Sequence, residues 1–239
     1  MTKQEICQPI YEKYHELSAS MQSDDLKLIK KLALELHALV HPAVVSASDA
    51  PTIADTVFEY MRFRGQSLLV PREDYENDLH YAGTNTVPLC WYFWHTYRIE
   101  DIVSNILMAN QNQIFNSCWQ RRIGSTITDT GNALTLEEAI DFGKNIHIDA
   151  LYEYMIEVAK NTRQIINHLT LEQINSMVPE EWVMRILEEG GVTTDFRSVW
   201  LLVFWGRLTR GGMILTPLTS HHMMHLPACL NMLLNERLI

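Results

Sequence analysis

Apolar residues recur along most of this chain at the spacing of about 3.6 residues that marks one face of an α-helix. One run of this kind ends at Pro42 and comprises Leu28, Ile29, Leu32, Leu36, Leu39 and Val40. Another covers residues 145–168, with apolar positions at Ile148, Leu151, Tyr154, Met155, Val158, Ile165 and Ile166. No segment shows the sustained alternation of apolar and polar residues that is typical of a sheet. The pattern predicts an all-α protein.

Start signals place several helices along the chain. Residues 3–20 form a first helix, and Ser23-Asp-Asp-Leu26 is typical of the start of a second. Thr135, followed three positions later by Glu138, fits a capping box. These helices predict one all-α domain over residues 1–239, most simply a four-helix bundle with additional short helices, in which residues 125–195 elaborate the bundle.

Glycine and proline mark the expected breaks. Residues 64–85 contain Gly65, Pro71 and Gly83 with little periodicity, which predicts a long loop. Further on, Gly211-Gly212 is expected to end a helix over residues 196–209. The last helix would then start near Pro217 and carry most of the chain's clustered histidines.

Two of those histidines, His221 and His225, stand one turn apart in the last helix. Residues at i and i+4 project within ~40° of each other on a helix. Leu218, Ala228, Cys229 and Met232 project to the same side, so both imidazoles are expected to face the protein interior. This spacing allows two rings to bind one metal ion.

A third histidine, His95, lies in the middle of an apolar stripe on a helix predicted over residues 87–109. Pro88, Trp91, Ile99, Ile102 and Ile106 project within ~40° of it, whereas Glu100, Asp101 and Ser104 project to the opposite side. Because a buried polar group without a partner costs about 1–3 kcal/mol, His95 is expected to have one.

Together, His95, His221 and His225 predict a metal site between two helices that are far apart in the sequence. Three imidazoles with an open fourth position suit catalytic zinc, and nickel or iron also accept imidazole. The open alternative is three hydrogen-bonded core histidines. The similar pair His37 and His41 projects off its apolar stripe, toward Lys27 and Lys30, and is expected to lie on the surface.

Composition narrows the choice of partners. The formal net charge of -10, without a cluster of Lys and Arg, argues against binding to nucleic acid. An export signal and an apolar run of membrane-spanning length are not evident, so a cytoplasmic protein without membrane contacts is expected. The four cysteines, Cys7, Cys90, Cys118 and Cys229, form no CxxC motif and are interpreted as small buried residues.

Three segments carry a resemblance to a known family: the run from Asn85 to Asp101, Phe204-Trp-Gly-Arg207, and the run from Met213 to Leu226. Together they resemble the DinB-like superfamily, which includes bacterial thiol-dependent S-transferases and mycothiol-dependent maleylpyruvate isomerase. The resemblance covers the chain from about residue 30 onward. It implies a four-helix bundle, a divalent metal held by His95, His221 and His225, and often a homodimer.

The family also suggests a reaction class. A metal-dependent transferase or hydrolase acting on a small molecule is expected, with zinc, nickel or iron and a low-molecular-weight thiol as candidate cofactors. From the residues themselves, His147 is a candidate catalytic base and Tyr154 a second candidate catalytic residue, and Tyr154 and Trp91 are expected to shape the pocket. Many relatives carry an Arg-Gly-Gln-like run after the last histidine, whereas Pro227 here predicts a kink just past His225. The rival hypothesis is a non-catalytic helical protein with a structural metal or none, in a binding or stress-related role.

Overall fold

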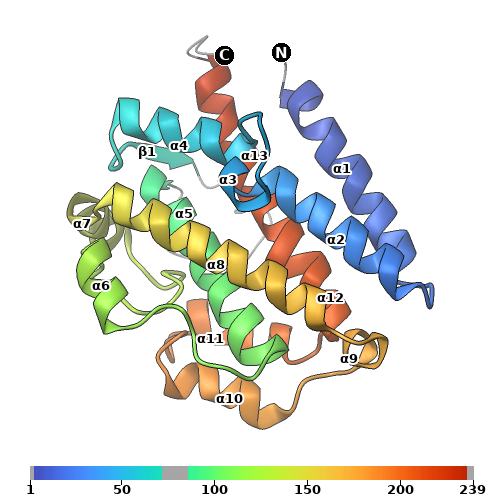
Figure 1. The fold of residues 1–239 in the computed structure, drawn as a ribbon. Coiled ribbons are helices and arrows are strands. Elements are labelled where there is room, and N and C mark those ends of the chain that lie inside the picture. Colours follow the sequence, from blue (N-terminus) through green and yellow to red (C-terminus); the bar gives the residue numbers. More distant parts are fainter. Residues whose placement is uncertain (1–2, 72–85, 236–239) are drawn as a thin grey trace.

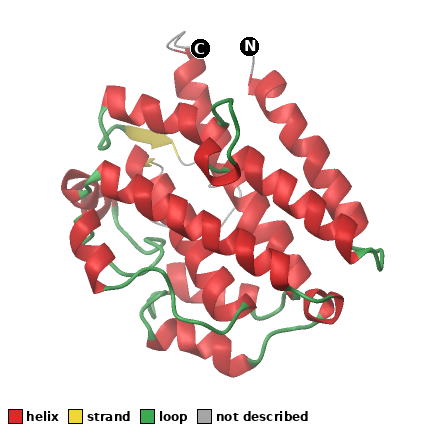
Figure 2. Ribbon diagram, viewed as in Figure 1, coloured by secondary structure: helices red, strands yellow, loops and turns green. Residues whose placement is uncertain are grey.

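A computed structural model describes residues 3–71 and 86–235 of the chain (Figure 1). Helices make up most of this part, as Figure 2 shows, which confirms the all-α class. The α-helices are α1 (Lys3–Ser20), α2 (Leu26–Val40), α3 (Ala43–Ser46), α4 (Ile53–Arg64), α5 (Leu89–Ile102), α6 (Ser117–Ile123), α7 (Leu136–Asn145), α8 (Ile148–His168), α9 (Leu171–Asn175), α10 (Glu180–Glu188), α11 (Phe196–Trp205), α12 (Arg210–Leu215) and α13 (His221–Asn235). Two π-helical segments, η2 (Val103–Met108) and η3 (Thr216–Ser220), continue α5 and α12.

Helix α5 lies at the centre of the molecule. Every one of its residues is buried, and α7, α8, η3 and α13 pack against it. In Figure 1, α8 crosses in front of α5, while α1 and α2 lie to one side. Helix α2 packs against α8 and η3, α8 packs against α5, and α5 packs against η3 and α13. These elements therefore surround one core. A helix covered on all sides has no face left for unpaired polar residues.

Side-chain caps fix several helix starts where the sequence predicts them. Asp25 accepts a hydrogen bond from the backbone N–H of Leu28, and α2 begins at the next residue. The capping box of Thr135 and Glu138 is present at the start of α7. Each cap satisfies N–H groups that have no partner within the helix.

The segment before the histidine helix differs from the prediction. Gly211-Gly212 does not end a helix, because Thr209 caps a new one by accepting a hydrogen bond from the N–H of Gly212. Helical structure then runs through η3 to Asn235, with Pro217 in the π-helical turn and Pro227 within α13. The extra residue in a π-helical turn changes which side chains of α13 point inward.

The predicted loop over residues 64–85 is described only up to Pro71. There β1 (Leu69–Pro71) pairs with β2 (Thr86–Pro88) in an antiparallel ribbon, Val70 opposite Val87, which the sequence did not predict. Residues 72–85 lie outside the described part. Within that part, no helix is long and apolar enough to cross a membrane.

Candidate metal site

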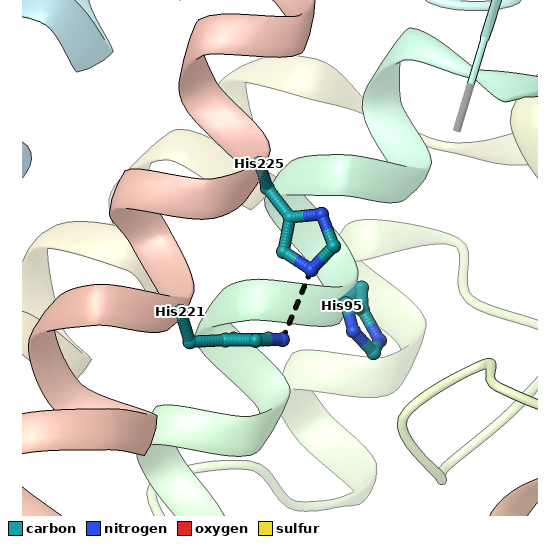
Figure 3. Close-up of side chains that lie close together, drawn as sticks. All are labelled: His95, His221 and His225. Atoms are coloured by element: carbon teal, nitrogen blue, oxygen red, sulfur yellow. Dashed lines mark hydrogen bonds between the residues drawn. The ribbon is translucent and has the colours of Figure 1, made fainter. Parts of the chain in front are cut away.

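Three histidines converge between α5 and α13. His221 and His225 are on consecutive turns of α13, and His95 faces them from α5 (Figure 3). Their ligand nitrogens all lie within 4.8 Å of one another, and the Nε2 atoms of His221 and His225 are 3.0 Å apart. The structure therefore brings together the three residues that the sequence predicts.

The cluster lies at the base of a cavity. His95 and His225 are 2% and 3% exposed, whereas His221 is only partly buried because it faces this cavity. The cavity has a volume of about 240 Å³ and is bounded mainly by apolar side chains of α11 and the η3–α13 segment. Those side chains are Trp200, Leu201, Phe204, Trp205, Pro217 and Met224.

A tight turn after α6 fixes the orientation of His95. The Nδ1 of His95 lies 2.9 Å from the carbonyl oxygen of Thr130, so Nδ1–H donates there and the lone pair of the neutral ring is on Nε2. Trp91 stacks on His95 at 4.3 Å between ring centroids and donates its indole N–H to the carbonyl of Gly131. Gly131 has φ +74°, and a Cβ atom there would come within 2.8 Å of that indole nitrogen. The turn therefore orients the His95 ring, as hydrogen-bond partners orient metal-binding histidines.

The environment disfavours a proton on His221. Burial lowers the pKa of His221 well below its ordinary value, and the nearby His225 and His95 lower it further, because a proton on one ring disfavours a proton on the next. Neutral imidazoles keep the lone pairs that a metal ion needs.

The donor set fits a divalent transition metal. Two nitrogens bound at ~2.0–2.1 Å to a tetrahedral zinc lie about 3.3 Å apart, close to the spacing of the His221 and His225 Nε2 atoms. Two facing Nε2 atoms cannot both carry a proton, so at least one lone pair points into the space between the rings. In this hydrogen bond one Nε2–H donates to the other Nε2, and a divalent ion in place of that proton would accept both lone pairs.

The two predicted catalytic residues lie elsewhere. His147 is exposed at the N-cap position of α8, where its backbone N–H donates to Ile123. Tyr154 is fully buried, and its hydroxyl donates to Asp101 at 2.7 Å and accepts from Arg98 at 3.2 Å. Neither side chain lines the cavity. Trp91 is also buried outside it, and its contact with His95 is a stacking contact.

A second cluster contradicts the surface position expected for His37 and His41. Both rings are 0% exposed, and both Nε2 atoms approach the carboxylate of Glu100, which is itself 0% exposed. His222 approaches the same carboxylate at 2.9 Å. The outward position expected for Glu100, Asp101 and Ser104 is also wrong, because α5 is covered on every side.

This second cluster holds an ionised carboxylate in the core. Burial alone would raise the pKa of Glu100, but the imidazoles, His41 first, hold it well below its ordinary value. Burial lowers the pKa of His37 and His41, and lowers that of His222 to about 4. The signal in the sequence was the i, i+4 spacing of His37 and His41; His222 was missed because it neighbours His221 and projects to a different side.

The fold and the first cluster define a helical protein with three convergent histidines beneath an apolar cavity. Comparison of the chain with known protein families, curated proteins and solved structures found no match.

Proposed function

We propose that this protein is a metal-dependent enzyme of the DinB-like superfamily, in which His95, His221 and His225 hold the ion. The convergence of three ligand nitrogens from α5 and α13 at the base of a cavity carries this proposal. These two helices are separated by more than a hundred residues, and helix bundles commonly build metal sites from side chains on facing helices.

A four-helix bundle made of α2, α5, α8 and α13 is part of the same proposal. The packing of α2 on α8, α8 on α5, α5 on α13, and η3 on α2 supports it, because each of these helices contacts its neighbours around one core. The remaining helices then pack around this bundle, and α11 lines the cavity.

The cavity suggests how the chain handles a substrate. A divalent ion bound at three histidines acts as a Lewis acid and lowers the pKa of a bound water or thiol. Trp200, Phe204 and Met224 surround the approach with apolar surface, which favours a small molecule with an apolar or aromatic part. The Thr130–Gly131 turn holds the His95 ring in place when a substrate enters the cavity. A thiol-dependent transferase and a hydrolase both fit this arrangement.

The rival function is a non-catalytic helical protein whose histidines are core residues or hold a closed structural metal. The partial exposure of His221 to the cavity favours the enzyme, because a closed site leaves no position for a substrate. Exchange of bound water or thiol at the fourth position separates the two functions.

Metal analysis of protein prepared without an affinity tag tests the proposal. We expect His225→Ala and His95→Ala each to lose one equivalent of transition metal, because both remove a ligand from the same ion. His15→Ala, which changes an exposed histidine on α1, is the matched control and should keep the wild-type content. Full retention of metal in both ligand variants, measured by elemental analysis, would overturn the proposal.

A further inference from the structure

The turn over residues 129–132 presents one amide side chain to the cavity. Asn132 is 2% exposed and lines the cavity together with His95 and His221. The hydroxyl of Thr130 donates to the Oδ1 atom of Asn132 at 2.6 Å, which assigns the amide orientation, with Nδ2–H₂ directed away from Thr130. The carbonyl oxygen of Thr130 also accepts from His95 at 2.9 Å. One residue therefore positions both a proposed metal ligand and a hydrogen-bond donor of the cavity.

Aromatic side chains of α11 form a wall of the same cavity. The rings of Trp200 and Phe204 both line it and lie 5.9 Å apart between centroids. The indole N–H of Trp200 donates to the carbonyl oxygen of Arg197, so this ring offers the cavity apolar surface. Trp205, which is 1% exposed, adds a third ring. These rings favour a ligand with an aromatic part, because aromatic groups stack on one another or pack edge to face.

The lining of the cavity excludes charge. Among the lining residues that the structure describes, none is a Lys, Arg, Asp or Glu, and the polar ones besides the histidines are Asn132 and Thr216. A carboxylate placed against this lining loses hydration without gaining a cationic partner, and the net charge of -10 opposes its approach. The volume of about 240 Å³ is also below the ~300–1,000 Å³ of typical ligand pockets. The lining therefore fits a small, uncharged group.

We propose that the substrate is a small, uncharged aromatic molecule with an oxygen acceptor, and that Asn132 is the residue that binds this oxygen. The Nδ2–H₂ group of Asn132 donates to the carbonyl or hydroxyl oxygen, while the aromatic part contacts Trp200 and Phe204. A few placed polar groups in an otherwise apolar pocket fix the orientation of a ligand in this way. The inference rests on the proposed function, because it takes this cavity as the substrate site of the three-histidine centre.

Titration of metal-free protein with matched probes, followed by ligand-observed NMR, tests the role of Asn132. Acetophenone carries a ring and a carbonyl oxygen, and α-methylstyrene has the same shape without the oxygen. We expect Asn132→Leu to weaken acetophenone binding about two- to tenfold, the effect of one lost hydrogen bond, without weakening α-methylstyrene binding. Asn167→Leu, the same change at an exposed position on α8, is the matched control. An unchanged Kd for acetophenone, or equal weakening of both probes, would overturn the role of Asn132.

A second pair of probes tests the charge of the ligand. 4-Acetylbenzamide and 4-acetylbenzoate are similar in size, and only the second carries a carboxylate. We expect the carboxylate probe to bind metal-free protein at least about tenfold more weakly, because its charge loses hydration in the cavity. Trp200→Ala should weaken binding of the amide probe, whereas Phe63→Ala, an exposed aromatic position on α4, should not. Equal affinities for the two probes would contradict the uncharged class, as would a wild type that binds no uncharged probe.

A wild-type crystal soaked in acetophenone covers the case in which Asn132→Leu fails to fold. The carbonyl oxygen should lie within about 3.2 Å of the Nδ2 atom of Asn132, and a bound ring whose oxygen points elsewhere would refute the assignment. Metal content, measured in parallel, separates this inference from the proposed function. Probe binding in a protein that takes up no metal would overturn the proposed enzyme alone. Metal held by the three histidines without probe binding would overturn the substrate class alone.

Discussion

At the scale of single residues, Cys118 is the cysteine whose position differs from the prediction. Cys7, Cys90 and Cys229 are buried as expected, whereas Cys118 is exposed on the short helix α6. Burial raises the pKa of the Cys90 thiol to about 12, so its reactive thiolate is scarce at neutral pH.

We therefore expect one fast-reacting thiol per folded chain and four after denaturation. The measurement is titration with a colorimetric disulfide reagent in buffer and in guanidinium chloride. Cys118→Ser should remove the fast reaction and leave three thiols in denaturant. A fast reaction that persists in this variant would show that one of the three buried thiols is accessible.

At the scale of elements, Asp101 links α5 to its surroundings. Its carboxylate accepts hydrogen bonds from Arg98, from Tyr154 on α8, and from the backbone N–H groups of Ile114 and Phe115. The side chains of Arg98 and Asp101 are 1% and 0% exposed. Such a buried network fixes the loop after η2 against α5 and α8.

Asp101→Asn is expected to lower the free energy of unfolding by about 3–5 kcal/mol, because it leaves the Arg98 guanidinium buried without a counter-charge. Urea unfolding followed by circular dichroism measures this loss. Leu136→Ala, at an exposed position on α7, is a suitable control and should change stability by less than about 1 kcal/mol.

Tyr154→Phe tests whether this tyrosine belongs to the network alone. We expect a loss of about 0.5–1.5 kcal/mol, the usual net contribution of one hydrogen bond, with metal content unchanged. Elemental analysis together with urea unfolding checks both parts. A loss of metal with unchanged stability would instead connect Tyr154 to the three-histidine site.

At the scale of the whole molecule, the proposed metal site couples segments that are far apart in the sequence. The ligands come from α5 and α13, which meet only in the folded chain. Metal binding should therefore stabilise the folded state over the unfolded one.

Removal of metal with a chelator is expected to lower the melting temperature. One site at a free metal concentration of about 100 times its Kd contributes about 2.7 kcal/mol, which corresponds to roughly 5–10 °C for a chain of this size. Differential scanning calorimetry with Zn²⁺ added back should restore the transition. Ca²⁺ should not, because it prefers oxygen ligands. Equal melting temperatures with and without Zn²⁺ would contradict this prediction.

The sequence by itself determined the helical class, several helix starts and the meeting of His95 with His221 and His225. Apolar periodicity and caps are local properties, and a histidine inside an apolar stripe faces the core wherever its helix packs. Thr135, Asp25 and the stripe around His95 are examples. That these histidines bind metal, and that the chain is a DinB-like enzyme, stays a prediction.

Only the tertiary structure decided whether the polar residues on the other helix faces are buried or exposed. Projection placed Glu100, His37 and His41 outside because it assumes that each helix has one solvent-facing side. Helix α5 has no solvent-facing side, and the C-terminal end of α2 around His37 is buried as well. Polar groups at these positions therefore pair with one another across helices. The π-helical turn before α13 and the side of α13 that carries His222 also depend on packing. For the histidine helix, the sequence identified one cluster, and the fold added a second.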